Sequence, residues 1–308
     1  MDDQILTKVA MLYYQHEMKH EEIGRELGWN RVKVTRALKE ARKRSLVEFV
    51  IHDPVAPFEN LERSLKVSFD LKKCRVSPSF TERHRTLNSL GRVGAEALPG
   101  FLPEEGTVAV AMSGAVAAAA DKLNVLHRPG LQFAATTGSV SRTSAETSAA
   151  LAVEFARRVG GTAYTVPGPL RSSPEIAAAL QDDPAIAAAL SMAESASHMV
   201  VGVGSMQAGG GRMRDSLSEY TIAELNQAGA VGDIAARFFD QKGRSVHTSI
   251  DDDLLALHLE KVLAIPRMMV IAAGAGKAIA ISTLLNRGSI TDLVVDADLA
   301  RALTSHKR

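Results

Sequence analysis

Apolar residues recur at intervals of three and four along the first 45 residues, which predicts three short helices. We place these helices within residues 5–14, 16–27 and 31–44. The positions that would face inward are Leu6, Val9, Ala10 and Tyr13, then Ile23 and Leu27, then Val34, Leu38 and Ala41. Gly28 is typical of a helix end and Asn30 of an N-cap, so a tight turn separates the second and third helices.

The pattern changes after this helical segment. Residues 47–52 alternate apolar and polar side chains like a strand, Pro54 and Pro57 begin a linker, and residues 58–73 have the spacing of an amphipathic helix. Further on, short apolar runs followed by Gly, Ser or Thr loops alternate with alanine-rich helices. The predicted strands lie within residues 107–112, 131–138, 162–170, 197–205, 268–276 and 291–296.

Strands that alternate with helices predict a mostly parallel sheet covered on both faces, with ligands bound at the carboxyl ends of the strands. The predicted fold class is therefore α/β. An N-terminal helix-turn-helix domain would span residues 1–53, and a Rossmann-like α/β effector domain would span residues 54–308. A three-helix domain that binds another protein is the alternative for the first of these.

Charge distinguishes the two ends of the chain. The 308 residues contain 36 Lys and Arg against 35 Asp and Glu, but residues 1–86 hold 17 basic and 13 acidic side chains. Residues 30–45 alone hold seven basic side chains and one acid. Such a local cluster indicates a nucleic-acid surface, with a solvated helix face as the alternative.

The basic side chains of the third helix are placed as DNA recognition requires. Arg36, Lys39 and Lys43 project away from the inward positions, while Arg31 and Lys33 lie in the first turn, which usually meets base edges. Arginine suits bidentate contact with guanine, and cations further along the helix neutralise phosphates. The predicted DNA-binding residues are Asn30, Arg31, Lys33, Thr35, Arg36, Lys39 and Lys43.

Composition argues against several other classes. A single cysteine, Cys74, excludes an intramolecular disulfide framework and a cysteine-based zinc cluster. The sequence has no run of about 18 uncharged apolar residues, and its N-terminal residues lack the pattern of a secretion signal. The nine histidines lack metal-ligand spacing, and the run Asp251–Asp253 is typical of a helix N-terminus. We therefore expect a cytoplasmic protein without a metal, a cofactor or a membrane partner.

Several stretches together carry a resemblance to a known family. The helical segment at residues 9–51, GAVGDIAARFFDQKG at 229–243 and the AGxxKAxAI pattern within 265–303 occur in the order found in SorC-family sugar-responsive bacterial transcription regulators. Residues 145–170 and 200–205 follow the same order, so the resemblance spans nearly the whole chain.

The resemblance implies a C-terminal fold similar to sugar-phosphate isomerases and glucosamine-phosphate deaminases, with the enzymatic activity lost and the pocket kept as a sensor. It further implies a homotetramer, a dimer of dimers, on double-stranded operator DNA. A phosphorylated sugar would release or reorganise that complex.

The loops after the predicted strands supply what a sugar phosphate requires, namely backbone N–H groups, hydroxyls and a cation. Lys277 is the predicted phosphate-binding cation, because it follows a buried strand at a helix start. Asp233 would accept hydrogen bonds from sugar hydroxyls or cap a helix, and Arg142 would bind a second anionic group or face solvent. The predicted effector-binding residues are Ser113, Gly114, Thr137, Gly138, Ser139, Arg142, Gly204, Asp233, Gly274 and Lys277.

The first of these loops departs from the family pattern. Members that bind phosphosugars often carry Gly and Thr there, where this chain has Ser113, Gly114 and Ala115. The effector is therefore predicted only as a sugar, a polyol or one of their phosphates. Two other functions compete: a sugar-phosphate isomerase or deaminase with a helical appendage, and an interaction scaffold. The enzyme is disfavoured because Asp233 lacks an evident partner for acid–base catalysis.

Overall fold

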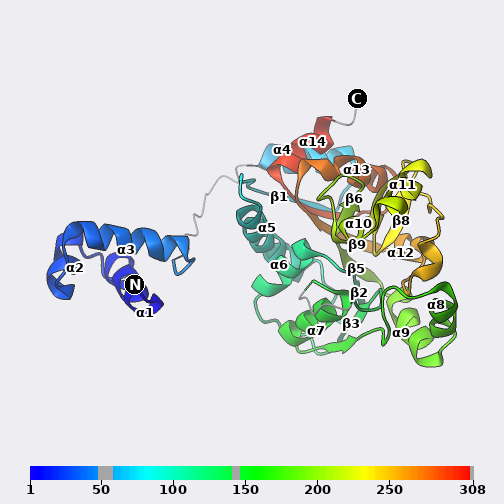
Figure 1. The fold of residues 1–308 in the computed structure, drawn as a ribbon, viewed down its shortest axis with the longest axis horizontal. Coiled ribbons are helices and arrows are strands. Elements are labelled where there is room, and N and C mark those ends of the chain that lie inside the picture. The colour runs from blue at the N-terminus through cyan, green and yellow to red at the C-terminus, as the bar shows by residue number, and fades with distance from the viewer. Residues whose placement is uncertain (48–57, 141–145, 306–308) are drawn as a thin grey trace. The chain divides into compact units, whose positions relative to one another are not determined.

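The computed structural model describes residues 1–47, 58–140 and 146–305 (Figure 1). The chain divides into two compact units, Met1–Pro57 and Phe58–Arg308. All but the first residue of the strand predicted within residues 47–52 lie outside the described residues. No described helix has the length and apolarity that crossing a membrane requires.

The first unit consists of α1 (Asp3–Tyr14), α2 (His20–Leu27) and α3 (Arg31–Lys43). Gly28 ends α2 in the left-handed region with φ 65°, and the Asn30 side chain accepts a hydrogen bond of 2.9 Å from the Lys33 N–H. Both predictions for the turn between these helices are therefore confirmed. The core of the unit is formed by buried apolar residues from all three helices: Leu6, Val9, Ala10, Ile23, Val34, Ala37, Leu38 and Ala41.

The second unit is built on a seven-stranded sheet in the order β1-β10-β9-β5-β2-β3-β4, in which every neighbouring pair is parallel. Its strands are β1 (Lys73–Ser77), β2 (Gly106–Val110), β3 (Leu131–Ala135), β4 (Thr162–Tyr164), β5 (His198–Val201), β9 (Arg267–Ala272) and β10 (Asp292–Asp296). The α/β fold class is thus confirmed. The sequence analysis assigned no element to residues 74–106 and so did not predict β1, and the helix that it placed at 58–73 extends past the end of α4 (Glu59–Ser68).

Alternate strand residues supply two hydrophobic cores on opposite faces of the sheet. In β9, Met268 and Val270 belong to one core and Met269 and Ile271 to the other. The first core is covered mainly by α4, α9 (Pro184–Glu194), α13 (Ala278–Asn286) and α14 (Ala297–Ser305). The second is covered by α5 (Arg83–Ala97), α6 (Gly114–Lys122) and α7 (Ser148–Val159). Both faces of the sheet are covered by helices.

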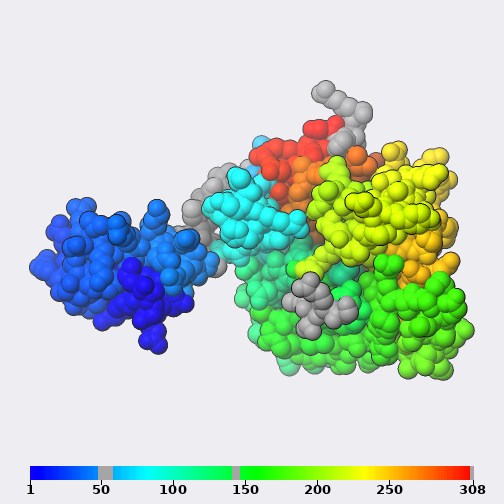
Figure 2. Space-filling model, in the orientation of Figure 1, coloured from blue at the N-terminus to red at the C-terminus, as the bar shows by residue number. Residues whose placement is uncertain are grey.

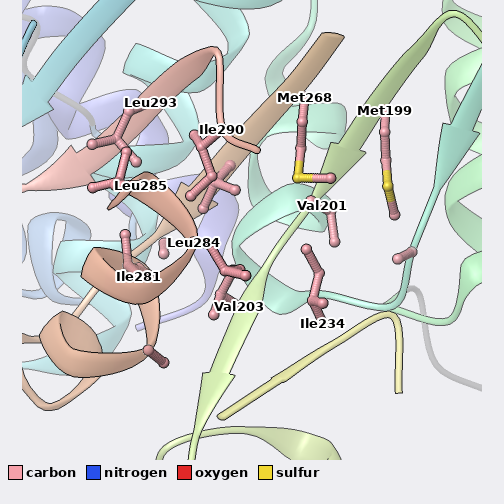
Figure 3. Close-up of a cluster of buried hydrophobic side chains, with 14 of the residues drawn as sticks. Met199, Val201, Val203, Ile234, Met268, Ile281, Leu284, Leu285, Ile290 and Leu293 are labelled. Carbon is pink, nitrogen blue, oxygen red and sulfur yellow. The ribbon is translucent and has the colours of Figure 1, made fainter. Parts of the chain in front are cut away.

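Figure 3 shows part of the first core, where Met199 of β5 and Met268 of β9 lie in the same cluster as Ile281 and Leu284 of α13. Val203 of the following strand extends this cluster toward a second sheet. These buried aliphatic side chains hold α13 against the sheet and so fix the loop that precedes it.

The second sheet is antiparallel and consists of β6 (Val203–Ser205), β7 (Ala230–Ile234) and β8 (Arg237–Asp240). The single strand predicted within residues 197–205 is divided at Gly202 into β5 and β6. Further short helices complete the unit: α8 (Pro174–Gln181), α10 (Arg212–Asp215), α11 (Glu219–Gln227), α12 (Leu259–Leu263) and the 3-10 turns η1 (Leu98–Gly100), η2 (Asp251–Asp253) and η3 (Ala275–Lys277).

Chain order in the parallel sheet defines where a ligand is expected. From β2 the chain proceeds outward to β3 and β4, then returns to β5 on the other side of β2 and proceeds to β9 and β10. The direction therefore reverses between β2 and β5. Loops at the carboxyl ends of these two strands diverge to opposite sides, which leaves a crevice between them.

Candidate effector site and DNA-binding surface

A cavity of about 610 Å³ lies at the carboxyl ends of β1, β2, β5, β9 and β10, at the position that the reversal in chain order predicts. One wall comes from the β1–α5 connection and another from the glycine-rich segment before α10. Figure 2 shows the cyan surface of the former beside the yellow-green surface of the latter. Arg83 joins them by donating a hydrogen bond of 3.5 Å to the Gly209 carbonyl.

The structure brings six of the predicted effector residues to this cavity: Ser113, Gly114, Gly204, Asp233, Gly274 and Lys277. Arg142 lies outside the described residues. Thr137, Gly138 and Ser139 are absent from the described lining and pack elsewhere. The Thr137 hydroxyl lies 2.8 Å from the Ser148 hydroxyl, and a Cβ at Gly138 would approach the Pro169 carbonyl to 2.7 Å. The loop after β3 is therefore packed against Ser148 and Pro169 and does not line the cavity.

Asp233 presents a buried carboxylate to the cavity. It lies on β7 opposite Gly204 of β6 and is only 8% exposed. Its Oδ1 atom has no hydrogen-bond partner among the described residues, and a Cβ at Gly204 would overlap that atom. Burial raises the pKa of Asp233 to about 6, against the opposing attraction of Lys277. A buried acceptor without a partner is costly, and Asp233 also lines the cavity, so its carboxyl group is suited to a hydrogen bond from a ligand.

Lys277 supplies a cation to the same cavity from the turn η3, immediately before α13. Burial lowers its pKa, while the negative charges of Asp233 and Asp296 oppose that effect. The ion pairs that the described cavity residues form do not include Lys277, so its charge is available to a ligand. The turn requires Gly274, whose φ of 100° lies in the left-handed region, and Asp296 accepts a hydrogen bond of 2.9 Å from its N–H.

The amino end of α6 forms the third part of the cavity. Ser113 caps this helix, because its hydroxyl accepts from the Val116 N–H at 3.3 Å, and Gly114 and Ala115 in the first turn line the cavity. Gly202 has to be a glycine, since a Cβ there would overlap the Ser113 hydroxyl. The helix dipole and the first-turn amides favour a bound anion at this end.

Six charged residues of the cavity were missed by the sequence analysis: Arg83, Glu146, Arg212, Asp215, Asp296 and Asp298. Arg212 and Glu146 form an ion pair. Asp296 is 2% exposed, and its second oxygen accepts from the Ser79 hydroxyl at 2.8 Å. The rule that selected the other loops also applies to Asp296, because it ends β10 at the same edge. No spacing in the sequence connects Arg83 or Arg212 to the site.

The elevated pKa of Asp233 makes a prediction for stability. A carboxyl whose pKa is raised by folding contributes stability below its unfolded pKa, and that contribution is lost as the pH rises through about 6. Between about pH 5 and pH 7 the wild-type chain should therefore lose about 1 kcal/mol more unfolding free energy than Asp233→Asn. Urea titrations at several pH values measure this difference. Parallel curves for the two proteins would show that Asp233 titrates normally in the folded state.

The predicted DNA-binding residues form an exposed surface on α3 and its N-cap: Asn30, Arg31, Lys33, Thr35, Arg36, Lys39 and Lys43. Lys33 lies over the Trp29 ring, 4.3 Å from its centroid. Arg44, the residue after α3, has a different environment, because it pairs with Glu40 at 2.8 Å and with Asp3 at 2.9 Å. Arg44 thus connects the end of α3 to α1, whereas the predicted residues leave a cationic face to solvent.

Within residues 1–47, 58–140 and 146–305, no three His, Cys, Asp or Glu side chains gather in a way that could hold a metal ion.

A family model described as "Putative sugar-binding domain" matches residues 53–305. The full-length sorbitol operon regulator SorC of Klebsiella pneumoniae superposes with a TM-score of 0.73 and 25% identity over 98% of this chain and 99% of that chain. The chain belongs to the SorC family of sugar-binding transcriptional regulators.

Two further relatives of this SorC-family regulator are named as regulators, and the similarity to each extends over nearly the whole of both chains. The transcriptional regulator LsrR of Escherichia coli K12 is 27% identical over 98% of this chain and 95% of that protein. The erythritol catabolism regulatory protein EryD of Brucella abortus is 23% identical over 98% and 96% respectively. The similarity therefore covers both compact units.

Proposed function

We propose that this SorC-family regulator binds operator DNA through α3, and that a phosphorylated sugar or polyol in the cavity controls its affinity for DNA. The observation that carries the proposal is the meeting of three groups at one cavity: the unpartnered Asp233 carboxylate, the unpaired Lys277 ammonium and the amino end of α6. Together they match a ligand that combines hydroxyl donors with an anionic group.

The assignment of roles follows from the chemistry of these groups. Hydroxyls of the effector donate to Asp233, and the phosphate is bound by Lys277 together with backbone N–H groups at the loop ends. An unphosphorylated polyol is the second candidate, because Ala115 lines the cavity where a threonine would offer a hydroxyl to a phosphate. If the effector is phosphorylated, Lys277 should contribute most to its affinity, whereas for an unphosphorylated polyol Asp233 should contribute most.

The similarity to transcriptional regulators over nearly the whole chain argues against turnover. A direct test is still required, because moving a proton next to a carbonyl needs a positioned acid and base, and the pKa of Asp233 is raised while that of Lys277 is lowered. We therefore infer a sensor rather than an isomerase or a deaminase. Aldose and ketose phosphates should remain unchanged after long incubation. A robust rate that disappears in Asp233→Asn would make the chain an enzyme.

Thermal unfolding against sugars, polyols and their phosphates tests the effector. A ligand at one hundred times its dissociation constant adds about 2.7 kcal/mol to the unfolding free energy, which gives a clear shift of the midpoint. Shifts confined to phosphates support the first candidate, and shifts with unphosphorylated polyols support the second. The absence of any shift would contradict the sensor role of the cavity.

We also propose that the protein is a homotetramer. Analytical ultracentrifugation with and without a ligand that shifts the unfolding midpoint tests this oligomeric state.

For DNA binding, we expect Arg31→Ala and Arg36→Ala to reduce the preference for the operator over unrelated DNA. Lys43→Ala should weaken both complexes similarly and lower the slope of log affinity against log salt by about one, because it removes one phosphate contact. Anisotropy titrations over a salt series measure both effects. Lys242→Ala, an exposed lysine of the second unit, is the control. Equal loss of specificity in all three α3 variants would show that the recognition face is misplaced.

A further inference from the structure

Val32 is an apolar side chain in the middle of the exposed face of α3. It is 61% exposed and occupies the first turn, directly after Arg31. The buried residues of this helix are Val34, Ala37, Leu38 and Ala41. At 3.6 residues per turn, Val32 lies about 170° around the helix axis from their mean direction. Val32 therefore points almost directly away from the core of its unit.

The surroundings of Val32 on this face are polar or cationic. Thr35, Arg36 and Lys39 follow it at intervals of three, four and seven residues, and all three are exposed. Valine is a poor choice for a helix surface that contacts only water, because its branched Cβ restricts the side chain and lowers helix propensity. An apolar Val32 side chain surrounded by cationic side chains fits a partner whose surface carries anionic groups around a small apolar group.

DNA offers that combination in the major groove. Phosphates border the groove, and the 5-methyl group of thymine is the apolar group among the base edges within it. We propose that Val32 contacts a thymine methyl group and is thereby a determinant of operator sequence. This inference rests on the proposed binding of DNA by α3. It places the thymine beside the base pairs that Arg31 and Arg36 contact, since those side chains flank Val32 on the helix.

The test uses the full chain and a duplex obtained by repeated selection from random sequences. Each thymine of the selected site is replaced singly by deoxyuridine, which removes the methyl group and leaves the hydrogen-bonding edge intact. We expect one replacement per half-site to weaken wild-type binding about fourfold, the effect of one buried methyl-sized group. Val32→Ala should bind the thymine and deoxyuridine duplexes equally at that position and keep wild-type sensitivity at the others.

Val67→Ala is the matched control, because Val67 is 79% exposed on α4 of the second unit. It should behave as wild type on every duplex. If no thymine shows a methyl effect that depends on Val32, the inference fails while DNA binding by α3 stands. If Val32→Ala instead lowers the oligomeric state and weakens all duplexes alike, the side chain serves a protein contact. If selection enriches no sequence, the proposed DNA binding fails, and this inference with it.

Discussion

Replacing Lys277 with methionine is expected to weaken the binding of a phosphorylated effector by roughly 100- to 1000-fold, the usual result of removing one partner of a desolvated charge pair. Methionine keeps most of the apolar stem, so the fold should be preserved. The loss is large because the substitution leaves a bound phosphate near Asp233 and Asp296 without the cation that offsets their charge. Isothermal titration of the effector that stabilises the wild-type protein measures the effect.

The control for this prediction is Lys261→Met, which removes an exposed lysine that pairs with Glu194 away from the described cavity lining. Its effector affinity should equal that of the wild type. The unphosphorylated parent sugar provides a second comparison, and its weaker binding should change little in Lys277→Met. A similar loss for both ligands would show that Lys277 supports the shape of the cavity and does not bind the phosphate.

The sequence was sufficient for local structure wherever a side chain determines the backbone beside it. Gly28 and Asn30 end α2 and begin α3 as predicted, because a left-handed C-cap and an acceptor side chain act within a few residues. The apolar runs of β2, β3, β9 and β10 were predicted for a similar reason, since parallel strands buried on both faces are continuously hydrophobic. β1 was missed because the sequence analysis assigned no element between the helix at residues 58–73 and the strand at 107–112, although the partial alternation within Lys73–Ser77 fits a strand.

The cavity was predictable only in part. Loops after parallel strands converge on one edge of a sheet, so Ser113, Gly274 and Lys277 could be grouped without coordinates. The same rule also selected Thr137, but β3 lies beyond β2 from the point where the chain order reverses, and its loop is held by other backbone. Strand order arises from long-range pairing, which one sequence does not reveal. Arg83 follows β1 and reaches the cavity only because β1 pairs with β10, so one sequence does not reveal its position either.

Arg237 is one residue whose role only the tertiary structure reveals, and its effect on stability should be large. The run Asp251–Asp253 was interpreted as a helix N-terminus, but it forms a 3-10 turn, and Asp251 pairs with Arg237 at 3.1 Å. The Arg237 side chain is 4% exposed and also donates to the carbonyls of Leu257 at 3.1 Å, Ala256 at 2.9 Å and Asp251 at 3.2 Å. It thereby fastens β8 to the segment at residues 251–257.

Arg237→Met should lower the unfolding free energy by about 3–5 kcal/mol, because it leaves the Asp251 carboxylate and buried carbonyls without their donors. Urea denaturation followed by circular dichroism measures the loss. Arg244→Met is the matched control, since Arg244 makes an exposed pair with Asp240 on the same hairpin and should cost less than about 1 kcal/mol. Combining Arg237→Met with Asp251→Leu should recover part of the loss by removing the unpaired charge. If Arg237→Met behaves like Arg244→Met, water or a rearranged loop satisfies Asp251, and the ion pair does not hold this hairpin in place.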